Sequence, residues 1–487
     1  MIRRNPLLIL LAACLVSCGD SAPAPQPQSP SPQFVSSDPS DAQTGVQTAD
    51  FVLKVKYDSN VRFEGSAGIS PSSASISYKE AHDGVCQFTV SGLECETTYT
   101  VTIPAGSVYV YGERENTAPE VRISFTTVDG PLAPPQPGQG SGGWENSTSA
   151  VRSMKTGWNL GNTLDSYGDW ILSTDKRPSD WETAWGQPVT KPELMKMFAD
   201  AGFGAIRVPV TWAQHFSSDG LTVDNDWMDR VEKIVTYVLD NGMYCILNTH
   251  HDTGTDGWLH ASSSNYGANS AKFKALWKQI AERFEKYGEK LLFEGFNEML
   301  DNNNNWGNPS EDAVKAINSY NADFVSTVRS TGGNNAHRNL VINTYAANVE
   351  SNSLEGFLIP EDSATDHLIA EFHSYAPYRF AFKQSDSSQQ LTVFDSVCEN
   401  EVKALITKAA AALHAKGVPC IIGEYGTDSA AASESEIAKQ ATCYVSTAKE
   451  LGLVCFYWMA LSDGQDRDVP QWTKPLIKNA ILKAAGI

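Results

Sequence analysis

The sequence predicts an α/β protein in which a (β/α)8 barrel follows a smaller antiparallel β-sandwich. Three observations predict this arrangement. Residues 144–487 alternate eight apolar, strand-like runs with amphipathic, helix-like stretches. Residues 34–128 hold short runs of alternating polarity bounded by Gly, Pro and Asp. A Pro-rich stretch precedes each of these two segments.

The composition excludes some classes of function. The chain has 487 residues, of which 41% are apolar, so it can bury large cores in about two or three domains. It carries 37 Lys and Arg against 57 Asp and Glu, a formal net charge of −20. Binding to nucleic acid requires a basic face that neutralises phosphates, so we expect no nucleic-acid partner. The 12 Trp residues are available to stack against flat ligands.

Residues 1–17 have the features of a secretory signal peptide. Arg3 and Arg4 give it a positive start, and an apolar run from 6 to 16 follows, which is too short to cross a ~30 Å hydrocarbon core. The segment Leu15–Cys18 resembles the lipoprotein box of bacterial signal peptides, which implies cleavage before Cys18 and its lipidation. We therefore expect a protein of the bacterial cell envelope that contacts a membrane only through this anchor.

Two low-complexity stretches define the predicted domain boundaries. Residues 18–33 are rich in Pro, Ser, Gln and Ala and are expected to form a semi-rigid stalk. Residues 129–143 are rich in Pro and Gly and are expected to form a linker. The predicted folded units are therefore 34–128 and 144–487.

Segment 34–128 is predicted to be the β-sandwich. The runs that read as strands are Phe51–Tyr57, Ala74–Tyr78, Cys86–Val90, Thr98–Ile103 and Val121–Thr127. The opening Ser37–Val46, the stretch Tyr99–Gly106 and the closing Phe125–Thr127 resemble a bacterial immunoglobulin-like domain. We expect a spacer, with a glycan-binding module as the alternative. Cys86 and Cys95 are nine residues apart around a Ser-Gly turn and could bridge a hairpin.

Segment 144–487 is predicted to form the barrel. The apolar runs that read as buried parallel strands are Thr156–Leu160, Ala205–Val210, Tyr244–Asn248, Leu291–Phe296, Leu340–Asn343, Leu368–Phe372, Cys420–Gly423 and Val454–Trp458. The helical stretches between them include Pro192–Ala201, Trp227–Asp240, Ala271–Lys286, Asp312–Arg329, Glu401–Lys416 and Ser433–Leu451. A dinucleotide-binding sheet would need a Gly-rich turn after its first strand, and Gly161–Asp165 is not such a turn.

Nearly every predicted strand ends in a residue that can carry or hold charge. In a barrel of this kind, chemistry takes place at the carboxyl ends of the strands. Glu298 and Glu424 both follow apolar runs and lie 126 positions apart, so only a closed fold would bring them together. Two carboxyl groups about 5–5.5 Å apart on either side of a glycosidic bond support hydrolysis with retention of configuration. Arg207 and Tyr375 have the chemistry needed to keep one of the two ionised.

Other acidic residues were weighed against this pair. Asn400 and Glu401 repeat the Asn-Glu sequence but have no apolar strand before them, so we read them as the start of a helix. Glu294 and Glu371 share strand parity with Glu298 and His373, and we expect them to point inward as a lower layer balanced by Arg207.

Two alternatives concern the histidines and tryptophans. The segment His250–Asp252 offers metal-binding side chains, but adjacent histidines on a strand should point to opposite faces, so we expect no metal site. Trp258 and Trp306 lie in polar loops and are expected to be cleft walls. Buried core positions are the alternative for these two and for Trp158, Trp185 and Trp212.

Taken together, the motifs of the second segment resemble glycoside hydrolase family 5, most closely its subfamily of endo-β-1,4-glucanases and xyloglucanases. The resemblance spans the segment through Gly157–Asp165, Ile206–Trp212, Asn248–Asp252, Phe293–Met299, Glu371–Tyr375, Ile422–Gly426 and Phe456–Trp458. Met299 departs from the Pro that follows Asn-Glu in many members, although members of this subfamily often lack it.

The resemblance implies a role for each matched residue. Glu298 would be the acid/base and Glu424 the nucleophile of a retaining hydrolase that needs no cofactor. Substrate-binding residues would be Asn162, Arg207, His250, Asn297, His373, Tyr375 and Trp458. The implied substrate is a plant cell-wall β-glucan, cut internally by a monomeric enzyme. Mannanase or xylanase activity on the same scaffold stays open, as does a surface lipoprotein that binds glycan without cutting it.

Overall fold

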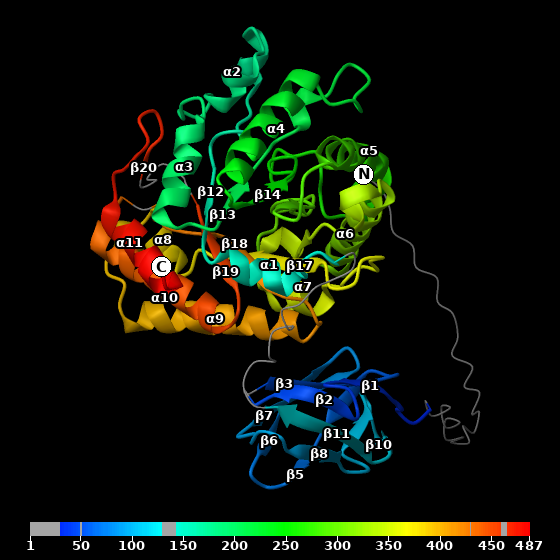
Figure 1. The fold of residues 1–487 in the computed structure, drawn as a ribbon. Coiled ribbons are helices and arrows are strands. Elements are labelled where there is room, and N and C mark those ends of the chain that lie inside the picture. The colour runs from blue at the N-terminus through cyan, green and yellow to red at the C-terminus, as the bar shows by residue number, and fades with distance from the viewer. Residues whose placement is uncertain (1–29, 49–50, 129–142, 429, 459–464) are drawn as a thin grey trace, which may run out of the picture. The chain divides into compact units, whose positions relative to one another are not determined.

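The computed structural model describes residues 30–48, 51–128, 143–428, 430–458 and 465–487, and it divides into two compact units, 1–129 and 130–487 (Figure 1). The predicted signal peptide, most of the predicted stalk and all but the last residue of the predicted linker lie outside the described residues. Within the described ranges, every helix is too short or too polar to cross a bilayer. Each unit is described by itself.

In its described ranges, 30–48 and 51–128, the first unit is built from strands and the turns and loops between them. One sheet has the order β1-β3-β7-β6 and another the order β2-β11-β8-β5, and a small third sheet has the order β10-β9-β4. The bounds are Phe34–Asp38 for β1, Gln43–Gln47 for β2, Phe51–Tyr57 for β3, Val61–Phe63 for β4, Gly68–Ser70 for β5, Ser75–His82 for β6, Val85–Ser91 for β7, Thr98–Ile103 for β8, Val108–Val110 for β9, Glu113–Thr117 for β10 and Val121–Val128 for β11. These sheets are consistent with the predicted immunoglobulin-like sandwich.

Alternation along the strands produces the core of this unit. Leu53 and Val55 of β3 pack with Phe88 of β7 and Ile123 of β11, all fully buried or nearly so. One strand departs from the expected antiparallel pattern, because β2 runs parallel to β11.

The predicted Cys86–Cys95 bridge is wrong. Both cysteines are free thiols: Cys86 lies in the sandwich core, whereas Cys95 is exposed in the turn before β8. A disulfide needs the two side chains to face one another at close range, and a buried core thiol and a solvent-exposed turn thiol do not meet this condition here.

The second unit is a closed barrel of parallel strands in the order β12-β13-β14-β15-β16-β17-β18-β19, which confirms the predicted fold. The strands are Gly157–Asn159, Ala205–Val208, Tyr244–Asn248, Leu291–Glu294, Leu340–Asn343, Leu368–His373, Cys420–Tyr425 and Val454–Tyr457. Every residue in these strands is buried, because barrel side chains on one face and helices on the other cover them. This double burial explains why the strands read as continuous apolar runs.

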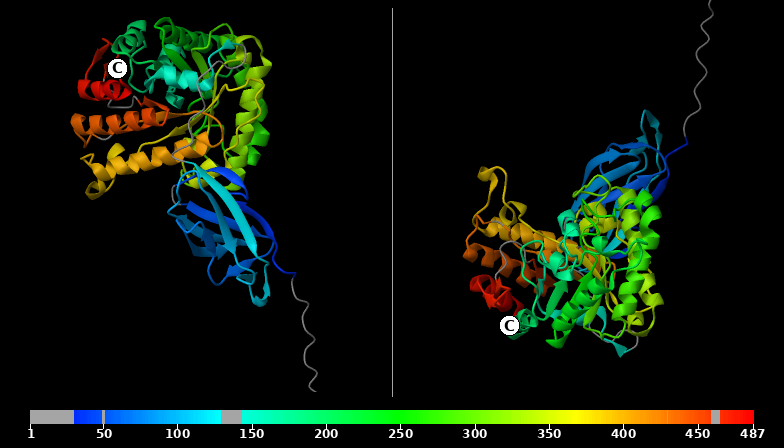
Figure 2. Two further views of the ribbon diagram at one scale, coloured as in Figure 1. Left: turned by 60° about the horizontal axis from the view of Figure 1, so that its bottom comes forward. Right: turned by 90° about the horizontal axis from the view of Figure 1, so that it is seen from above.

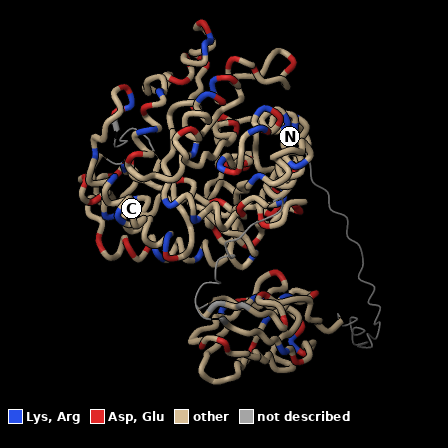
Figure 3. The backbone as a smooth tube through the Cα atoms, in the orientation of Figure 1, with Lys and Arg blue, Asp and Glu red and all other residues tan. Residues whose placement is uncertain are grey.

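Helices surround the barrel, as Figures 1 and 2 show. They are α3 Pro192–Ala201, α4 Asn225–Asp240, α5 Ser263–Phe284, α6 Glu311–Ser330, α7 Ser351–Gly356, α8 Tyr378–Ala381, α9 Ser396–His414, α10 Glu434–Glu450 and α11 Pro475–Ala485, with the short α2 Pro178–Glu182 in the loop before α3. Acidic and basic positions are dispersed over these helices and the loops between them (Figure 3).

Two helices begin earlier than predicted because capping residues set their first turns. Helix α5 starts after Ser262, whose side chain accepts the backbone N–H of Asn265. Helix α9 starts after Asp395, whose carboxylate accepts the N–H groups of Val397 and Cys398. Glu401 therefore lies inside α9, and the interpretation of Asn400 and Glu401 as a helix start is wrong.

The barrel interior has two layers below the strand ends. At the bottom, inward residues such as Ile246, Leu292 and Ile369 form an apolar cluster with α1 (Ser147–Met154), which closes the barrel floor through Val151 and Met154. Above it, six successive strands, β12 to β17, each contribute one fully buried polar residue: Asn159, Arg207, Asn248, Glu294, Asn343 and Glu371. This polar layer supports the side chains at the barrel mouth.

Candidate active site

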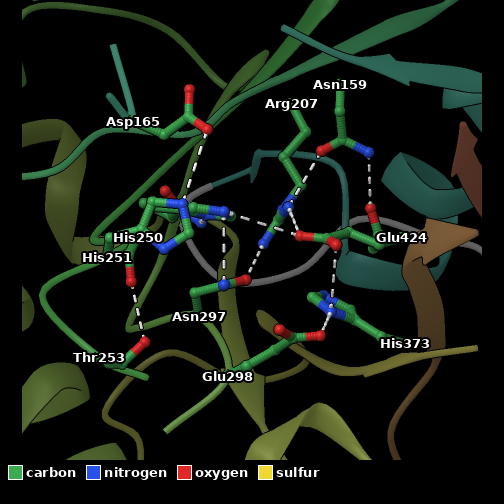
Figure 4. A network of polar contacts seen from close by, with 12 residues as sticks. Asn159, Asp165, Arg207, His250, His251, Thr253, Asn297, Glu298, His373 and Glu424 are labelled. Carbon is green, nitrogen blue, oxygen red and sulfur yellow. Dashed lines mark hydrogen bonds and ion pairs between the residues drawn. The ribbon is translucent and has the colours of Figure 1, made fainter. Parts of the chain in front are cut away.

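Glu298 and Glu424 meet at the carboxyl ends of the strands. Glu298 follows β15, and Glu424 lies near the end of β18. One carboxylate oxygen of each lies within 4.8 Å of the other, with a ring nitrogen of His373 in the same cluster (Figure 4). The Glu298 side chain keeps 22% of its surface exposed and Glu424 only 6%, so Glu298 is the more open of the two.

The surroundings of Glu424 favour its ionised form. Its Oε1 accepts a hydrogen bond from Arg207 Nη1 at 2.8 Å, and its Oε2 accepts one from the Tyr375 hydroxyl at 2.7 Å. His373 Nδ1 lies 3.7 Å from Oε2. Burial alone would raise the pKa of Glu424, but the charges of His373 and Arg207 and these hydrogen bonds outweigh burial and lower it.

The pKa of Glu298 is shifted in the opposite direction. Burial raises its pKa, and the charge of Glu424 raises it further, against the opposing effect of His373. Its Oε1 lies 2.8 Å from His373 Nδ1. The protonated form is thus favoured for one carboxyl group and the ionised form for its neighbour. An acid/base residue and a nucleophile that act together require this difference in pKa.

Arg207 is the centre of the polar layer. All five of its N–H donors are used: Nε and Nη2 donate to the two oxygens of Glu294 at 2.7 Å each, Nη1 donates to Asn159 and Glu424, and Nη2 also donates to Asn297 at 2.9 Å. Because the side chain is fully buried, these bonds hold a fixed cation beneath the carboxylate pair.

A register shift positions Glu424. In the pairing of β17 with β18, Phe372 faces Ile422 but the next residue, His373, faces Glu424, so β18 carries one extra residue, Gly423. Such a bulge re-aims the side chain that follows it. Glu424 is thereby brought beside His373 at the barrel mouth.

One wall of the site is aromatic. The rings of His250 and Trp458 stack with centroids 5.4 Å apart and planes inclined by 7°. Asn297 Nδ2 lies 3.4 Å from His250 Nε2. Burial lowers the pKa of His250 well below its usual range, so the ring is neutral at physiological pH. A neutral imidazole and an indole form a polar edge and a flat face of the kind that binds a sugar ring.

Two cavities extend from the carboxylate pair. One, of about 260 Å³, is lined by residues that include His250, Asn297 and Trp458. The other, of about 650 Å³, is lined by residues that include Trp306 and Tyr378, whose side chains are 55% and 65% exposed. Both cavities are lined by Glu298, Tyr375 and Phe382, so they adjoin at Glu298, while Glu424 lines the smaller one.

Two groups of side chains have the spacing of metal ligands. In the first, Asp165, His250 and His251 lie within 4.8 Å of one another, so the expectation that the two histidines diverge is wrong. They follow β14 rather than belong to it, and the alternation of a strand ends at Asn248. Both Asp165 oxygens, however, accept backbone N–H groups, from Asn162 and Thr163.

The second group consists of Glu298, His373 and Glu424 themselves. Its donors are also engaged by protein groups, since His373 Nδ1 contacts Glu298, and Arg207 and Tyr375 donate to Glu424. The donor chemistry therefore fits proton transfer between protein groups better than it fits metal coordination.

Most of the residues predicted for the site are brought together. Arg207, His250, Asn297, His373, Tyr375 and Trp458 all contact one another or one of the two glutamates. Asn162 is the exception: it adopts a left-handed backbone conformation (φ 55°), and its backbone N–H binds Asp165. The amide that enters the network is Asn159, which bonds Arg207 and the carbonyl of Gly423.

The site also contains residues that were not among the predicted site residues. Asn248 Nδ2 donates to Glu294 at 2.9 Å, and Glu371 contacts His373. Their signal in the sequence was inward strand parity, which had identified Glu294 and Glu371 as a lower layer near Arg207. The predicted balance with Arg207 is confirmed for Glu294.

Of the two tryptophans predicted to be cleft walls, Trp306 lines a cavity beside the carboxylate pair and Trp258 does not line either of the two cavities described above. Trp306 lines the larger cavity, while Trp158 and Trp212 are fully buried core residues. Trp258 is half-buried, and its ring N–H donates to Asp252 at 2.7 Å. It therefore braces the loop after β14.

A closed (β/α)8 barrel with two facing carboxyl groups at its mouth, whose pKa values are shifted in opposite directions, is typical of a glycoside hydrolase. Comparison with known proteins agrees: the family model described as cellulase (glycosyl hydrolase family 5) matches residues 164–464. The chain belongs to glycoside hydrolase family 5.

Three similar proteins illustrate this relationship. Endoglucanase A of Ruminococcus albus is 34% identical over 348 residues, covering 69% of this chain and 92% of that protein. A family 5 enzyme from Prevotella bryantii, solved with a xyloglucan tetradecasaccharide, is 41% identical with a TM-score of 0.64, covering 70% of this chain and 99% of that one. A family 5 lichenase from a Caldicellulosiruptor species is 32% identical with a TM-score of 0.66, covering 73% and 98%.

Proposed function

We propose that this chain is an endo-acting, retaining β-1,4-glucan hydrolase in which Glu298 is the acid/base and Glu424 the nucleophile. The observation that carries the proposal is the juxtaposition of these two carboxyl groups, whose pKa values are shifted in opposite directions. A separation within 4.8 Å is shorter than the spacing of about 6.5–9.5 Å that inverting enzymes use, which favours the retaining reaction.

In the first step, Glu424 attacks the anomeric carbon while Glu298 gives its proton to the glycosidic oxygen. The C–O bond to the leaving sugar breaks, and a glycosyl ester forms on Glu424. Asn297, held by Arg207 at 2.9 Å, is placed to bind the sugar 2-hydroxyl, a contact that strengthens as the anomeric carbon becomes cationic. Trp458 and His250 would hold the sugar face on the smaller-cavity side.

In the second step, Glu298 acts as a base. It takes a proton from a water molecule, whose oxygen attacks the anomeric carbon and releases Glu424. The sugar leaves with its original configuration because the carbon has been inverted twice. His373, at 2.8 Å from Glu298, stabilises the carboxylate present between the two steps.

The shape of the site supports internal cleavage of a polymer. The two cavities adjoin at Glu298, which lines both, and together they offer space for more than one sugar unit of a glucan chain. The names of similar proteins, an endoglucanase, a lichenase and an enzyme crystallised with xyloglucan, support a plant cell-wall β-glucan as substrate.

The opposite pKa shifts predict the pH profile. Activity requires ionised Glu424 and protonated Glu298 in the free enzyme. The acidic limb of kcat/KM should therefore lie below 4.5, the ordinary pKa of a glutamate, and the alkaline limb above it. A profile with both limbs on the same side of this value would contradict the assignment.

The roles are tested by removing each carboxyl group. Glu298→Gln and Glu424→Gln should each fold and lose about 10²–10⁴-fold or more of reducing-sugar release from barley β-glucan, xyloglucan and carboxymethyl cellulose. The matched control, Glu361→Gln, changes an exposed loop glutamate and should keep full activity. Substantial glucan hydrolysis by either site variant, or release of mannan or xylan fragments only, would overturn the proposal.

Azide separates the two roles. In Glu298→Ala, azide should attack the glycosyl ester and give a β-glycosyl azide from a dinitrophenyl β-cellobioside. In Glu424→Ala, no ester can form, and a single displacement should give the α-azide. The opposite pairing of products would exchange the two roles.

We also propose that Cys18 carries a lipid that tethers the enzyme to the bacterial envelope. The support is the basic start, the apolar run and the Leu15–Cys18 segment of the sequence. The β-rich unit, 34–128, would then act as an immunoglobulin-like spacer between anchor and barrel. We expect the enzyme to act as a monomer, which light scattering of the full chain carrying Cys18→Ser would test against the mass of 52.9 kDa for all 487 residues, less that of residues 1–17 where they are removed.

A further inference from the structure

Glu371 is a fully buried carboxylate that contacts His373, the hydrogen-bond partner of the acid/base, and the mechanism above does not use it. It lies on β17 two residues before His373, so both side chains point into the barrel. Its Oε1 lies 3.1 Å from His373 Nε2, and its Oε2 has no hydrogen-bond partner among the described residues. A buried carboxylate that is satisfied on one side only requires an explanation.

Charge balance for Arg207 does not explain it. Glu371 Oε1 comes within 3.5 Å of Arg207 Nε, but all five Arg207 donors bond to other groups, with Glu294 taking Nε itself. Glu371 therefore receives no hydrogen bond from the guanidinium. Its hydrogen-bonding partner is the imidazole of His373.

The neighbouring strand leaves room for this contact. Gly423 is the extra residue of the β18 bulge, and a Cβ at this position would collide with Glu371 Oε1 and press on His373 Nε2. The same glycine that re-aims Glu424 thus opens the space in which Glu371 and His373 meet.

We infer that Glu371 is a positioning residue for the acid/base, holding His373 with a proton on Nε2 so that Nδ1 serves Glu298. This inference rests on the proposed roles of Glu298 and Glu424. A carboxylate only accepts hydrogen bonds, so Nε2 must be the donor to Glu371. Nδ1 is then the one ring nitrogen through which His373 can respond to the proton of Glu298.

This arrangement acts in both steps of the reaction. When Glu298 has given its proton to the leaving oxygen, it is an anion, and an imidazolium donating from Nδ1 binds it with a charge-assisted hydrogen bond. Glu371 supplies the negative charge that makes the imidazolium favourable in a buried site. When water then returns a proton to Glu298, His373 remains in place and unchanged.

Several charged groups face His373. Glu298 and Glu424 approach Nδ1, Glu371 binds Nε2, and Arg207 lies below. Burial lowers the pKa of His373, but the charges of Glu424, Glu371 and Glu298 outweigh burial and raise it to about 10. Of the other titratable groups nearby, Glu294 is paired with Arg207, Tyr375 with Glu424, and His250 is neutral.

Glu371→Gln is the decisive variant because its amide oxygen can still accept from Nε2 while the charge is lost. Loss of the Glu371 charge lowers the pKa at which the coupled pair of Glu298 and His373 releases its first proton. This holds whichever of the two groups releases that proton. The alkaline limb of kcat/KM on β-glucan should therefore move to lower pH by about one to three units. Between the new limb and that of the wild type, the variant should lose roughly tenfold in kcat/KM per pH unit relative to the wild type.

Leaving-group dependence distinguishes positioning from a general structural effect. A dinitrophenyl β-cellobioside needs no protonation of its leaving group, so Glu371→Gln should change its kcat/KM by less than about threefold. Loss on β-glucan should be larger, as in Glu298→Gln. Glu294 lies in the same polar layer as Glu371 but binds Arg207 and not His373. Glu294→Gln should therefore shift the acidic limb of the kcat/KM profile and not the alkaline limb.

A spectroscopic measurement on the wild type does not depend on any variant folding. In the full chain with 15N-labelled histidine, the His373 ring, assigned by its absence in His373→Gln, should have both nitrogens protonated at pH 8. A neutral His373 at pH 8 would overturn the inference. So would an unchanged alkaline limb in folded Glu371→Gln, or equal losses on glucan and dinitrophenyl substrate. If these occur while Glu298→Gln is inactive, the proposed function stands without this inference.

Discussion

Replacing Arg207 by Lys tests whether the buried guanidinium organises the site. Arg207 makes five hydrogen bonds, three to carboxylate oxygens of Glu294 and Glu424 and two to the amides of Asn159 and Asn297. Lysine carries the same charge but only three donors and no planar fork. The substitution therefore keeps the positive charge but removes the planar arrangement of hydrogen-bond donors.

The magnitude follows from the count of bonds. At least two of the five are lost, and a buried hydrogen bond to a charged group contributes about 1.5–3 kcal/mol. The variant should thus be less stable by about 3–6 kcal/mol, a large part of the 5–15 kcal/mol typical of a folded domain. Glu424 has a lowered pKa, so the stability it contributes is present above an unfolded pKa near 4.5 and is lost as pH falls through the folded value. The difference in free energy of unfolding between Arg207→Lys and the wild type should accordingly become smaller as the pH falls.

Urea unfolding followed by Trp fluorescence is a clean assay, because all 12 Trp residues lie in the segment 144–487. Arg177→Lys is the matched control: Arg177 is 67% exposed and pairs with Asp180, so its replacement should cost no more than about 1 kcal/mol. In folded Arg207→Lys, the acidic limb of kcat/KM should also rise, since Glu424 has lost a fixed donor. A stability within about 1 kcal/mol of the wild type together with an unchanged limb would refute the reasoning.

Three further predictions concern the cleft and the anchor. Trp458→Ala should lower kcat/KM on the order of tenfold, because the ring that stacks on His250 is lost from the sugar-binding wall. Trp306→Ala should impair cleavage of long β-glucans more than cleavage of an aryl cellobioside, because Trp306 lines the larger cavity. Trp170 is 59% exposed and is not among the residues that line the two cavities, so Trp170→Ala should leave both activities unchanged. Equal losses of Trp306→Ala on both substrates would contradict the prediction. Cys18→Ser should move the protein expressed in bacteria from the detergent to the aqueous phase in detergent partitioning, and wild-type protein in the aqueous phase would argue against the anchor.

The barrel could be predicted from the sequence because its strands are buried on both faces. Each strand is a short apolar run followed by a helix, and this pattern identified all eight. The sandwich was harder to predict. Strands such as Val61–Phe63 and Gly68–Ser70 have three residues each, too few for an alternation to be recognised, and tertiary pairing alone defines them. The early start of α5 was hidden by the Ser-, Asn- and Gly-containing turn 263–270, which has little helix propensity of its own.

The site could be predicted where strand geometry governs side-chain direction and not where a loop does. Parity placed Glu294 and Glu371 inside the barrel, and they lie there. Parity failed for His250 and His251, which follow the end of β14, and their rings lie 4.6 Å apart. Asn159, and not the predicted Asn162, joins the hydrogen-bond network, and the substrate contact predicted for Asn162 stays a prediction, since the sequence gives no signal for the direction of a left-handed loop residue.

A one-residue offset explains why two glutamates in one pocket can differ in ionisation. Arg207 reaches Glu424 directly, but on the facing strand end its donor is taken by Asn297, the residue before Glu298. Glu298 therefore has no direct bond from the guanidinium and depends on His373. Exchanging the amide and the acid, as in Asn297→Glu combined with Glu298→Asn, would place a third carboxylate on Arg207, beside Glu294 and Glu424, and would remove the carboxylate that binds His373 Nδ1. The carboxyl group at position 297 would then be held ionised like Glu424, no proton donor would face the glycosidic oxygen, and hydrolysis should fall at least as far as in Glu298→Gln.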